Sequence, residues 1–540
     1  MKTLIGRSMR LALAVLLLVS PNLALAKDNL IIAIPGLPSG VDLDRHVSPQ
    51  TWTMAAQLFE SGMEWEMGDY PFESGKAFDP TNLEGYQYPI GYTTQNTTPA
   101  LFESCEEFEG GQRVVYHIQP GIMSAWGNEF TADDVIWRYN REKELPIIYA
   151  LVSHLFNTDT ATKTKIDDYT VELTNDVPMP LACPGLTNFY NAWLDSKEVS
   201  RHASGDDPHS ANWLATNGGG FGAYYVTEWS PGKRVIMEAN PNYYKGEPVI
   251  GRITYVVVPE SAGRLALLQR GEVDIAEGLS PDEINALADN ESAAGVAVRG
   301  NSQMWLIANN NHEEMTDLRV RQAINYAIPR TEIVDNVYHG MAREWNGVIS
   351  SVTPGYVESD AYAFDLKKAR SLLEEAGKGD GFTLELAFSA GVPEMENMAV
   401  LLQDSLGEIG ISLDLKKLPV AAHADLVQSR NAQLALWIDS PIQPDSNYVM
   451  SLVYSSGDLA LVNYSNYQDD YVDAKLVEGS AIADAEERIE FHKDLQSHIR
   501  EDAAFGWVVE PYFRIGVSRA ITGFRWFTTQ YYKVALMSSK

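Results

Sequence analysis

The chain has 540 residues, a formal net charge of −32 at pH 7 and a hydrophobic fraction of 45%. Its apolar fraction is ordinary for a globular protein, and its length exceeds what one hydrophobic core usually serves, so we expect two or three compact units. The acidity argues against nucleic acid as a partner, because phosphates would be repelled. It permits a cationic ligand without establishing one, since acidic surfaces mostly serve solubility.

The first 26 residues predict a secretory signal peptide. Lys2, Arg7 and Arg10 precede the apolar run Leu11 to Val19, which gives way to Ala24-Leu25-Ala26. A basic head, an apolar stretch too short for a bilayer and a small-x-small exit are typical of a segment removed on export, with cleavage near Ala26. No cysteine follows to carry a lipid, and no later segment is apolar for long enough to cross a membrane. We therefore expect a soluble protein in the periplasm.

Apolar runs between turn residues predict strands and helices in the first half of the chain. Ile31 to Ile34 indicates a short strand that leads into the turn-rich stretch Pro35 to Gly40, a typical place for a loop facing a cleft. Ile253 to Val258 indicates a buried strand. Ser261 can cap the helix that follows, and Gly271 can stop it.

The second half repeats this alternation more regularly. Asp317 opens a helix that Pro329 ends, and Thr331 caps a further helix that closes at Gly340. Two helix-to-strand units follow. The helix of the first begins at the cap Asp365 and ends at Gly377, and the helix of the second ends at Gly410; residues 382–388 and 411–415 then alternate as strands. This order predicts an α/β fold.

Two cysteines, Cys105 and Cys183, are too few for a disulfide scaffold or a cysteine zinc site. In an oxidising compartment they could form one bridge, or they could remain free and buried. The sequence alone leaves both possibilities open, because it does not fix the distance between their Cα atoms.

The chain lacks the common sequence motifs of catalytic and metal sites. The chain has no G-x-S-x-G, no H-E-x-x-H and no histidine pair at helical ligand spacing, so we expect no catalytic site, metal or cofactor. Ser204, Asp207 and His209 are close in sequence, but triad members usually come from distant segments, and a polar loop is expected. Gly218 to Gly222 resembles a phosphate cradle, yet a strand pattern follows it, so we expect a hinge turn or a cleft wall.

Several segments together resemble one family, the extracytoplasmic solute-binding proteins of peptide-type ABC importers (family 5). They occur in the family's order and spacing: Tyr116 to Gly121 with Phe130 to Val135, Trp213 to Tyr224, Asn240 to Tyr244, Leu267 to Ile275, and Leu318 to Ile328. Phe221 and Ala223 stand where the family usually has threonine and proline. The resemblance covers essentially the whole mature chain.

The resemblance implies a two-lobed α/β fold with a hinge and an extra subdomain inserted in the first lobe. The expected parts are a signal peptide (1–26), a lobe I core (27–60, 205–283 and 506–540), an inserted subdomain (61–204) that contains both cysteines, and lobe II (284–505). The implied function is capture of a peptide or peptide-like solute between the lobes and delivery to an ABC permease with its ATPase subunits, by a monomer without enzymatic activity. The alternatives are the same fold binding an opine, an oligosaccharide or a cationic compound, and an exported hydrolase.

The sequence departs from the family pattern where the ligand is recognised. Peptide binders commonly carry an aspartate three residues after a tryptophan to bind the ligand's α-amino group, whereas Asp439 lies two residues after Trp437. Dipeptide binders carry an arginine for the ligand carboxylate after the strand equivalent to residues 384–388, and here Glu394 and Glu396 follow instead. A free dipeptide is therefore disfavoured. The two glutamates would suit a cationic group, or they simply begin a helix.

The candidate ligand-binding residues are one aspartate, one glutamate and five aromatic residues. They are Trp437, Asp439, Trp305, Phe221, Tyr224, Tyr448 and Glu394. The aromatic side chains would supply stacking or apolar walls, with core packing as the alternative for each of them.

Overall fold

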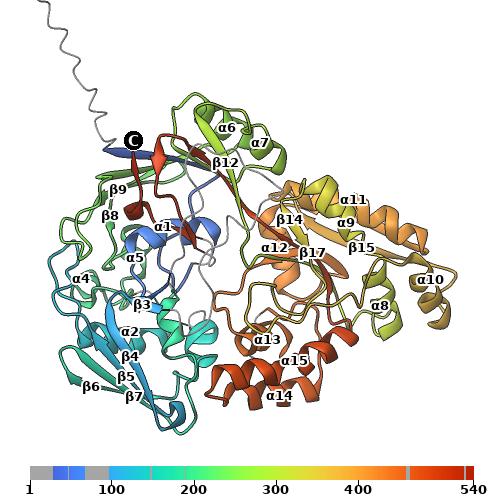
Figure 1. The fold of residues 1–540 in the computed structure, drawn as a ribbon, viewed down its shortest axis with the longest axis horizontal. Coiled ribbons are helices and arrows are strands. Elements are labelled where there is room, and N and C mark those ends of the chain that lie inside the picture. The colour runs from blue at the N-terminus through green and yellow to red at the C-terminus, as the bar shows by residue number, and fades with distance from the viewer. Residues whose placement is uncertain are drawn as a thin grey trace, which may run out of the picture.

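The computed structural model describes residues 28–46, 48–66, 97–145, 149–188, 190–191, 193–457, 462–527 and 531–539. The expected signal peptide lies outside these ranges. Within them, no helix is both long enough and apolar enough to cross a membrane. The chain forms two α/β lobes, which lie side by side in Figure 1, and the first lobe carries an additional small sheet.

The first lobe is built on a seven-stranded sheet of order β12-β19-β11-β1-β10-β9-β8. These strands are β1 (Asn29–Ile34), β8 (Tyr224–Ser230), β9 (Arg234–Ala239), β10 (Arg252–Val257), β11 (Ile275–Glu277), β12 (Ala293–Val298) and β19 (Phe513–Ser518). β1 runs parallel to β10 and β11 and is covered on one face by α1 (Pro49–Leu58) and on the other by α6 (Ser261–Gln269) and α7 (Pro281–Asn285). The predicted strands at 31–34 and 253–258 and the helix that stops before Gly271 are confirmed. Ser261 is not its cap: it is the first residue of α6, and Glu260 occupies the N-cap position.

The glycine-rich stretch Gly218 to Gly222 joins α5 (Ala211–Asn217) to β8 inside this lobe. Gly218 and Gly219 have φ of +79° and +103°, a conformation that side chains with a Cβ rarely adopt. A Cβ on Gly222 would lie 2.3 Å from the carbonyl carbon of Leu58, so the backbone approaches the end of α1 closely. The turn packs within lobe I and is not at either crossing between the lobes, so the expected hinge turn is wrong.

The inserted subdomain is an antiparallel sheet of order β4-β5-β7-β6 with its own core. Its main elements are β4 (Phe102–Phe108), β5 (Arg113–Ile118), α2 (Ala132–Glu142), β6 (Thr162–Asp167), β7 (Thr170–Thr174) and α4 (Ser196–Arg201). Shorter elements around it are β2 (Met63–Trp65), β3 (Thr97–Pro99), η2 (Glu109–Gly111), η3 (Tyr149–His154) and η4 (Pro184–Thr187). Thr131 and Asp134 form a capping box at the start of α2. Cys105 and Cys183 are joined by a disulfide within this subdomain.

Buried ion pairs fix the loop after β1 to the inserted subdomain. Both terminal nitrogens of Arg141, on α2, donate to the carboxylate of Asp42, at 3.2 and 2.8 Å, and Arg138 lies 2.7 Å from Asp44. All four side chains are nearly inaccessible to solvent. Because breaking a buried charge pair leaves an uncompensated charge, the core of lobe I and its inserted subdomain should move as one body.

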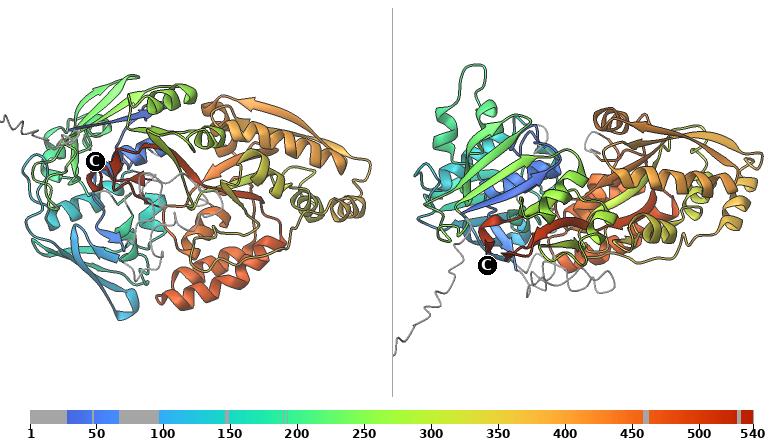
Figure 2. Two further views of the ribbon diagram at one scale, coloured as in Figure 1. Left: turned by 45° about the horizontal axis from the view of Figure 1, so that its top comes forward. Right: turned by 90° about the horizontal axis from the view of Figure 1, so that it is seen from above.

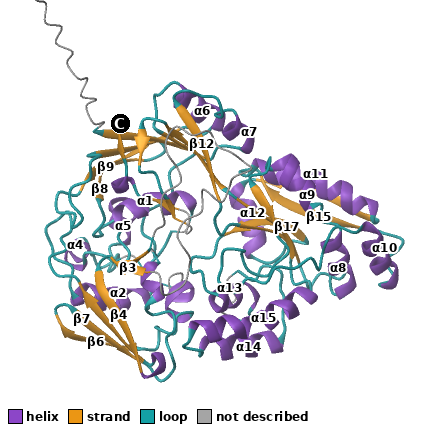
Figure 3. Ribbon diagram, viewed as in Figure 1, coloured by secondary structure: helices purple, strands orange, loops and turns teal. Residues whose placement is uncertain are grey.

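Lobe II is built on a six-stranded sheet of order β14-β18-β13-β17-β15-β16. Its strands are β13 (Gln303–Ala308), β14 (Ala342–Glu344), β15 (Phe382–Ser389), β16 (Ile411–Leu418), β17 (Leu434–Asp439) and β18 (Gly506–Pro511). One face packs against α8 (Leu318–Tyr326), α10 (Leu366–Glu375) and α11 (Pro393–Glu408), and the other against α12 (Val420–Gln428), α13 (Ser446–Tyr454), α14 (Asp470–Ser480) and α15 (Ala485–Glu501). Figure 3 shows these helices around the sheet.

Most predicted helix ends in lobe II are confirmed. Asp317 and Asp365 accept backbone N–H groups at the starts of α8 and α10. Gly377 and Gly410 follow α10 and α11 with positive φ. The predicted cap Thr331 is wrong: Pro329 precedes α9 (Arg330–Glu332), which continues as the π-helical turn η5 (Ile333–Val337), and the hydroxyl of Thr331 donates to Glu344 instead.

Within the described residues, the chain passes between the seven-stranded and the six-stranded sheet twice. The first crossing, residues 299–302, joins β12 of lobe I to β13 of lobe II, and the second, at Tyr512, joins β18 to β19. The β18–β19 stretch is the long dark red segment that runs from one lobe to the other (Figure 2). The predicted boundaries at 284 and 506 are therefore wrong, because β12 still pairs in lobe I and β18 pairs in lobe II.

The chain ends with short paired strands beyond β19. They are β20 (Ile521–Thr522) with β23 (Ser538–Ser539), and β21 (Trp526–Phe527) with β22 (Tyr531–Tyr532), followed by the single turn η6 (Val534–Leu536). Lys533 forms buried ion pairs with Glu60 and Glu64, which follow α1. The C-terminal segment is thereby fastened to lobe I.

Candidate ligand site between the lobes

The centre of the lobe II sheet brings three of the predicted residues onto one face. In the antiparallel pairing of β13 with β17, Gln303 lies opposite Asp439 and Trp305 lies opposite Trp437. Side chains opposite each other on paired strands share a face, and alternate residues of one strand do as well. Asp439 ends β17 and Gln303 begins β13, so both lie beside the first crossing between the lobes.

Asp439 is the single carboxylate of this group. It is half-buried, and its Oδ1 accepts a hydrogen bond of 2.7 Å from the backbone N–H of Ser440. Burial raises the pKa of Asp439 above its ordinary value, although the Ser440 N–H and the indole of Trp437 oppose the shift. A carboxylate in such a place gains stability from a cation brought close to it.

Two buried tyrosines from different lobes lie close enough to this carboxylate for its charge to affect them. Tyr448 lies on α13 of lobe II, and its hydroxyl has no hydrogen-bond partner within the described residues. Tyr190 comes from the inserted subdomain of lobe I. Burial raises the pKa of both tyrosines well above the ordinary value, and the negative charge of Asp439 adds to the shift in each. Both lobes therefore contribute to one site around Asp439.

Trp437 and Trp305 extend the aromatic surface of the same face. Trp437 is half-buried, with its ring 5.7 Å from His423 in a stacked arrangement and 5.3 Å from Tyr464 edge-on. Trp305 is fully buried and lies 5.6 Å from Phe505. We call Gln303, Trp305, Trp437, Asp439, Tyr448 and Tyr190 the interlobe cluster. So defined, it has one carboxylate, no lysine and no arginine.

The structure places the other three predicted residues outside the interlobe cluster. Phe221 lies in the core of the inserted subdomain, 5.0 Å from Phe130. The hydroxyl of Tyr224 donates to the backbone oxygen of Ile250 at 2.9 Å, in the core of lobe I. Glu394 begins α11 and forms an ion pair with Arg514 of β19, across the two lobes. Packing accounts for the first two residues, and an interlobe ion pair accounts for the third.

Two members of the interlobe cluster were missed by the sequence reasoning. Gln303 lies two residues before Trp305, so strand alternation could have placed the two side chains on one face. Tyr190 follows η4 in an irregular part of the inserted subdomain and carries no periodic signal. Its contact with lobe II depends on how the lobes meet, and no local pattern reports that.

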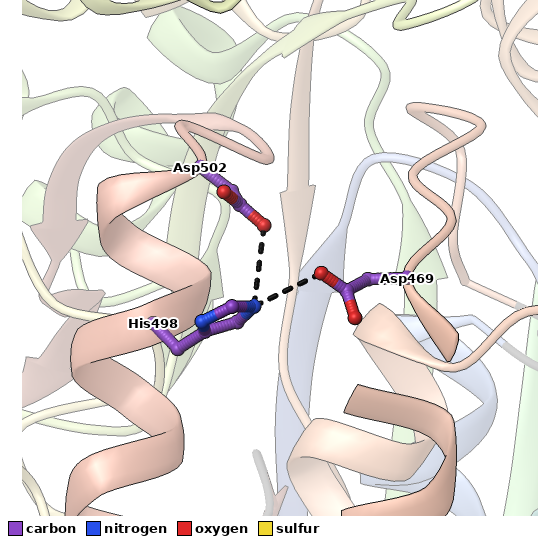
Figure 4. Close-up of side chains that lie close together, drawn as sticks. All are labelled: Asp469, His498 and Asp502. Atoms are coloured by element: carbon purple, nitrogen blue, oxygen red, sulfur yellow. Dashed lines mark hydrogen bonds and ion pairs between the residues drawn. The ribbon is translucent and has the colours of Figure 1, made fainter. Parts of the chain in front are cut away.

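A second cluster of titratable side chains joins the start of α14 to the end of α15. His498 Nε2 lies 2.9 Å from Asp469 Oδ2 and 3.6 Å from Asp502 Oδ2 (Figure 4). Burial alone would raise the pKa of Asp469, but hydrogen bonds from His498 and from two backbone N–H groups of α14 hold it below its ordinary value. A helix cap with an ion pair accounts for this cluster.

Ser204, Asp207 and His209 form no triad. Ser204 and Asp207 close a backbone turn, and His209 lies 2.7 Å from Glu144. The prediction of a polar loop is confirmed.

Two α/β lobes joined by two crossings, with a buried polar cluster contributed by both, define the class of two-lobed solute-binding proteins. Residues 96–460 match the family model for bacterial extracellular solute-binding proteins, family 5 Middle. The chain belongs to this family, and the resemblance seen in its sequence is confirmed.

Curated relatives and solved structures agree with this assignment. The oligopeptide-binding protein AppA of Bacillus subtilis is 26% identical over 478 residues, which cover 83% of this chain and 84% of AppA. The periplasmic binding protein DppA of Helicobacter pylori, solved with the peptide STSA, matches with a TM-score of 0.79 at 19% identity, covering 95% of this chain and 98% of that one. MoaA of A. tumefaciens R10, solved with mannopinic acid, matches with a TM-score of 0.78 at 20% identity, covering 95% and 100%. At these identities the solved structures show the shared fold.

Proposed function

We propose that this protein is the periplasmic receptor of an ABC importer and that it binds a peptide or peptide-like solute that carries a cationic amine. The observation that carries the proposal is the interlobe cluster: Tyr448, which lies near Asp439 in lobe II, packs edge-on against Phe156 of the inserted subdomain with ring centres 5.8 Å apart, so a solute held there would contact both lobes. Such a solute favours the closed arrangement, because it gains contacts that the open one lacks. The predicted signal peptide and the periplasmic relatives support the location.

The chemistry of the site supports a cationic ligand. Asp439 is positioned to bind an ammonium group, whereas the interlobe cluster has no basic side chain to bind a free carboxylate. Glu394, which replaces the family's arginine region, is neutralised by Arg514 and is therefore not an additional anionic anchor. We propose that the ligand's carboxylate, where it has one, lies away from this cluster, and that acidic dipeptides bind poorly.

The first test is the Asp439→Asn variant. A charge-assisted hydrogen bond contributes about 1.5 to 3 kcal/mol, so the variant should bind peptides with a free amino terminus about 10- to 100-fold more weakly. Native mass spectrometry of the freshly purified protein identifies retained solutes, and calorimetry with tripeptide amides and their N-acetylated counterparts measures the affinities. Asp414→Asn, on an exposed position of β16, is the matched control.

Three results would contradict the proposal. Equal affinity of wild type and Asp439→Asn for free-amine peptides would remove the anchoring role of Asp439. Tight binding of an acidic dipeptide would contradict the charge argument. Chemical breakdown of the peptides in proportion to the protein added would favour the exported hydrolase over the receptor.

A further inference from the structure

The side-chain carboxamide of Gln303 is buried and has no hydrogen-bond partner among the residues that the structure describes. Gln303 has 0% exposure, and neither its Nε2 nor its Oε1 meets a hydrogen-bonding group in the described part of the chain. Burying both ends of an amide away from water costs free energy unless a partner is supplied. Native structures leave few such groups, and each requires an explanation.

Gln57 is a buried carboxamide with a structural role in the same molecule, and it provides a comparison for Gln303. It is equally buried, at 1% exposure, but its Nε2 donates to the backbone oxygen of Tyr532 at 2.6 Å and its Oε1 accepts the backbone N–H of Val534 at 2.8 Å. Gln57 thus pairs both of its ends with peptide groups and fastens the C-terminal segment. Gln303 offers the same donor and acceptor, and no peptide group among the described residues pairs with them.

Gln303 lies within the interlobe cluster. Its side chain shares a face with Trp305 and with its cross-strand partner Asp439, whose Cβ lies about 5 Å away in such pairs. The carboxamide could donate to that carboxylate, yet no such hydrogen bond forms. Nearby, the hydroxyl of Tyr448 and the indole N–H of Trp305 also have no partner within the described residues.

We propose that Gln303 is a specificity-determining residue that pairs, through both ends of its carboxamide, with an amide group of the ligand adjacent to the amine bound by Asp439. The inference rests on the proposed function and narrows it: the ligand class is an amine followed within one residue by an amide, as at the amino end of a peptide. A site built to hydrogen-bond such a group rejects an analogue that lacks it, because its own buried polar atoms then stay unpaired.

The Gln303→Met variant separates a ligand-binding role from a structural one. Methionine has a similar volume and no amide, so it relieves the buried unpaired groups. We expect the unfolding temperature of the ligand-free protein to rise by about 1 to 3 °C, or at least not to fall. Gln57→Met is the matched control and should lower the unfolding temperature, since the three hydrogen bonds of its carboxamide, to Thr53, Tyr532 and Val534, are lost. A fall for Gln303→Met comparable to that for Gln57→Met would overturn the inference in favour of a structural role, such as bridging a buried water.

Binding tests the same variant independently. The probes are free-amine tripeptide amides and their analogues with an ester in place of the first peptide bond. Wild type should prefer the peptide about tenfold, and Gln303→Met should lose most of that preference, whereas Asp439→Asn should weaken peptide and ester alike. If tripeptides bind but Gln303→Met keeps the wild-type ratio of peptide to ester affinity, the role proposed for Gln303 is wrong and the proposed function still stands. If wild type binds none of the tripeptides, the proposed function fails, and the inference fails with it.

Discussion

Glu277 is a carboxylic acid held in the core of lobe I. It ends β11 at 7% exposure, and its Oε1 accepts a hydrogen bond of 2.6 Å from the hydroxyl of Tyr532. Burial raises the pKa of Glu277 to about 7, against the opposing hydrogen bonds from Tyr532 and Thr53. Its protonated form is therefore the one that the folded protein favours.

The raised pKa of Glu277 makes stability depend on pH in a defined direction. Below about pH 4.5, the pKa of Glu277 in the unfolded chain, the carboxyl group is protonated in both states and does not change the free energy of unfolding. Between about pH 4.5 and 7 only the unfolded state releases the proton. The free energy of unfolding therefore falls by up to about 3 kcal/mol over this range. Glu277→Gln should remove this penalty. We expect the variant to exceed wild type in chemical denaturation at pH 8 and to match it near pH 4.5.

An exposed glutamate of the same lobe provides the control. Glu247→Gln should leave the pH dependence of wild type unchanged. A stability difference between Glu277→Gln and wild type that is the same at pH 4.5 and pH 8 would show that Glu277 ionises normally.

At the residue scale, the sequence predicts the site residues that belong to a local motif. The resemblance to the family's tryptophan–aspartate pattern points to Trp437 and Asp439, and the structure places both at the end of β17 beside the first crossing between the lobes. For Glu394 the sequence leaves open a ligand-facing acid or the start of a helix, and the structure places it in the first turn of α11. Its partner Arg514 is 120 residues away, so local pattern does not reveal the ion pair. The same limit applies to Tyr190, which reaches the site only from the other lobe.

At the scale of single elements, helix ends were predictable because caps are local. Asp317 and Asp365 accept backbone N–H groups of the next turn, and the glycines after α10 and α11 adopt the left-handed backbone that few other residues tolerate. Thr331 failed because Pro329, two residues earlier, already starts that helix. The lobe boundaries failed because strand pairing, which acts at long range, decides to which sheet β12 and β18 belong.

The disulfide between Cys105 and Cys183 stabilises the inserted subdomain. It does not connect the two lobes. It closes a 78-residue separation within the inserted subdomain. Reduction should lower the free energy of unfolding by roughly 2 to 4 kcal/mol, mainly because the unfolded chain regains freedom. Calorimetric affinity for the peptide probes should be nearly unchanged, because the bridge lies within one lobe.

The double variant Cys105→Ser with Cys183→Ser should reproduce the effect of reduction and should no longer respond to reductant. Two reactive thiols in the denatured, unreduced wild-type protein would contradict the bridge. A large loss of affinity on reduction would show that the subdomain transmits strain to the ligand site.

At the scale of the whole molecule, the lobes also touch on the side away from the crossings. Asn157 of the inserted subdomain donates through Nδ2 to the backbone oxygen of Ser480, at the end of α14, at 3.2 Å, and to Pro178 within its own subdomain at 2.9 Å. Asn157 has φ of +58°, so its backbone is held in the left-handed region. This contact exists only while the lobes are together.

Asn157→Gly should weaken closure while keeping the backbone conformation. The loss of one hydrogen bond of about 1 kcal/mol should lower the affinity for peptide probes about fivefold. Small-angle scattering should show a larger radius for the ligand-free variant than for wild type. Asn191→Ala, which removes a carboxamide-to-carbonyl hydrogen bond inside the subdomain, should change neither quantity; an equal effect of both variants would mean that Asn157 supports only its own subdomain.

The placement of β19 also constrains how the protein is made. β19 pairs with β11 on one side and β12 on the other, yet it is synthesised more than 200 residues after either of them. A growing chain therefore exposes two open strand edges in lobe I until all of lobe II has been produced, and open edges are templates for aggregation. The stretch from Gly506 to Ser518 supplies one strand to each lobe, so a chain that stops before it leaves both sheets incomplete. The chain can therefore complete its native fold only after its last few dozen residues have been synthesised.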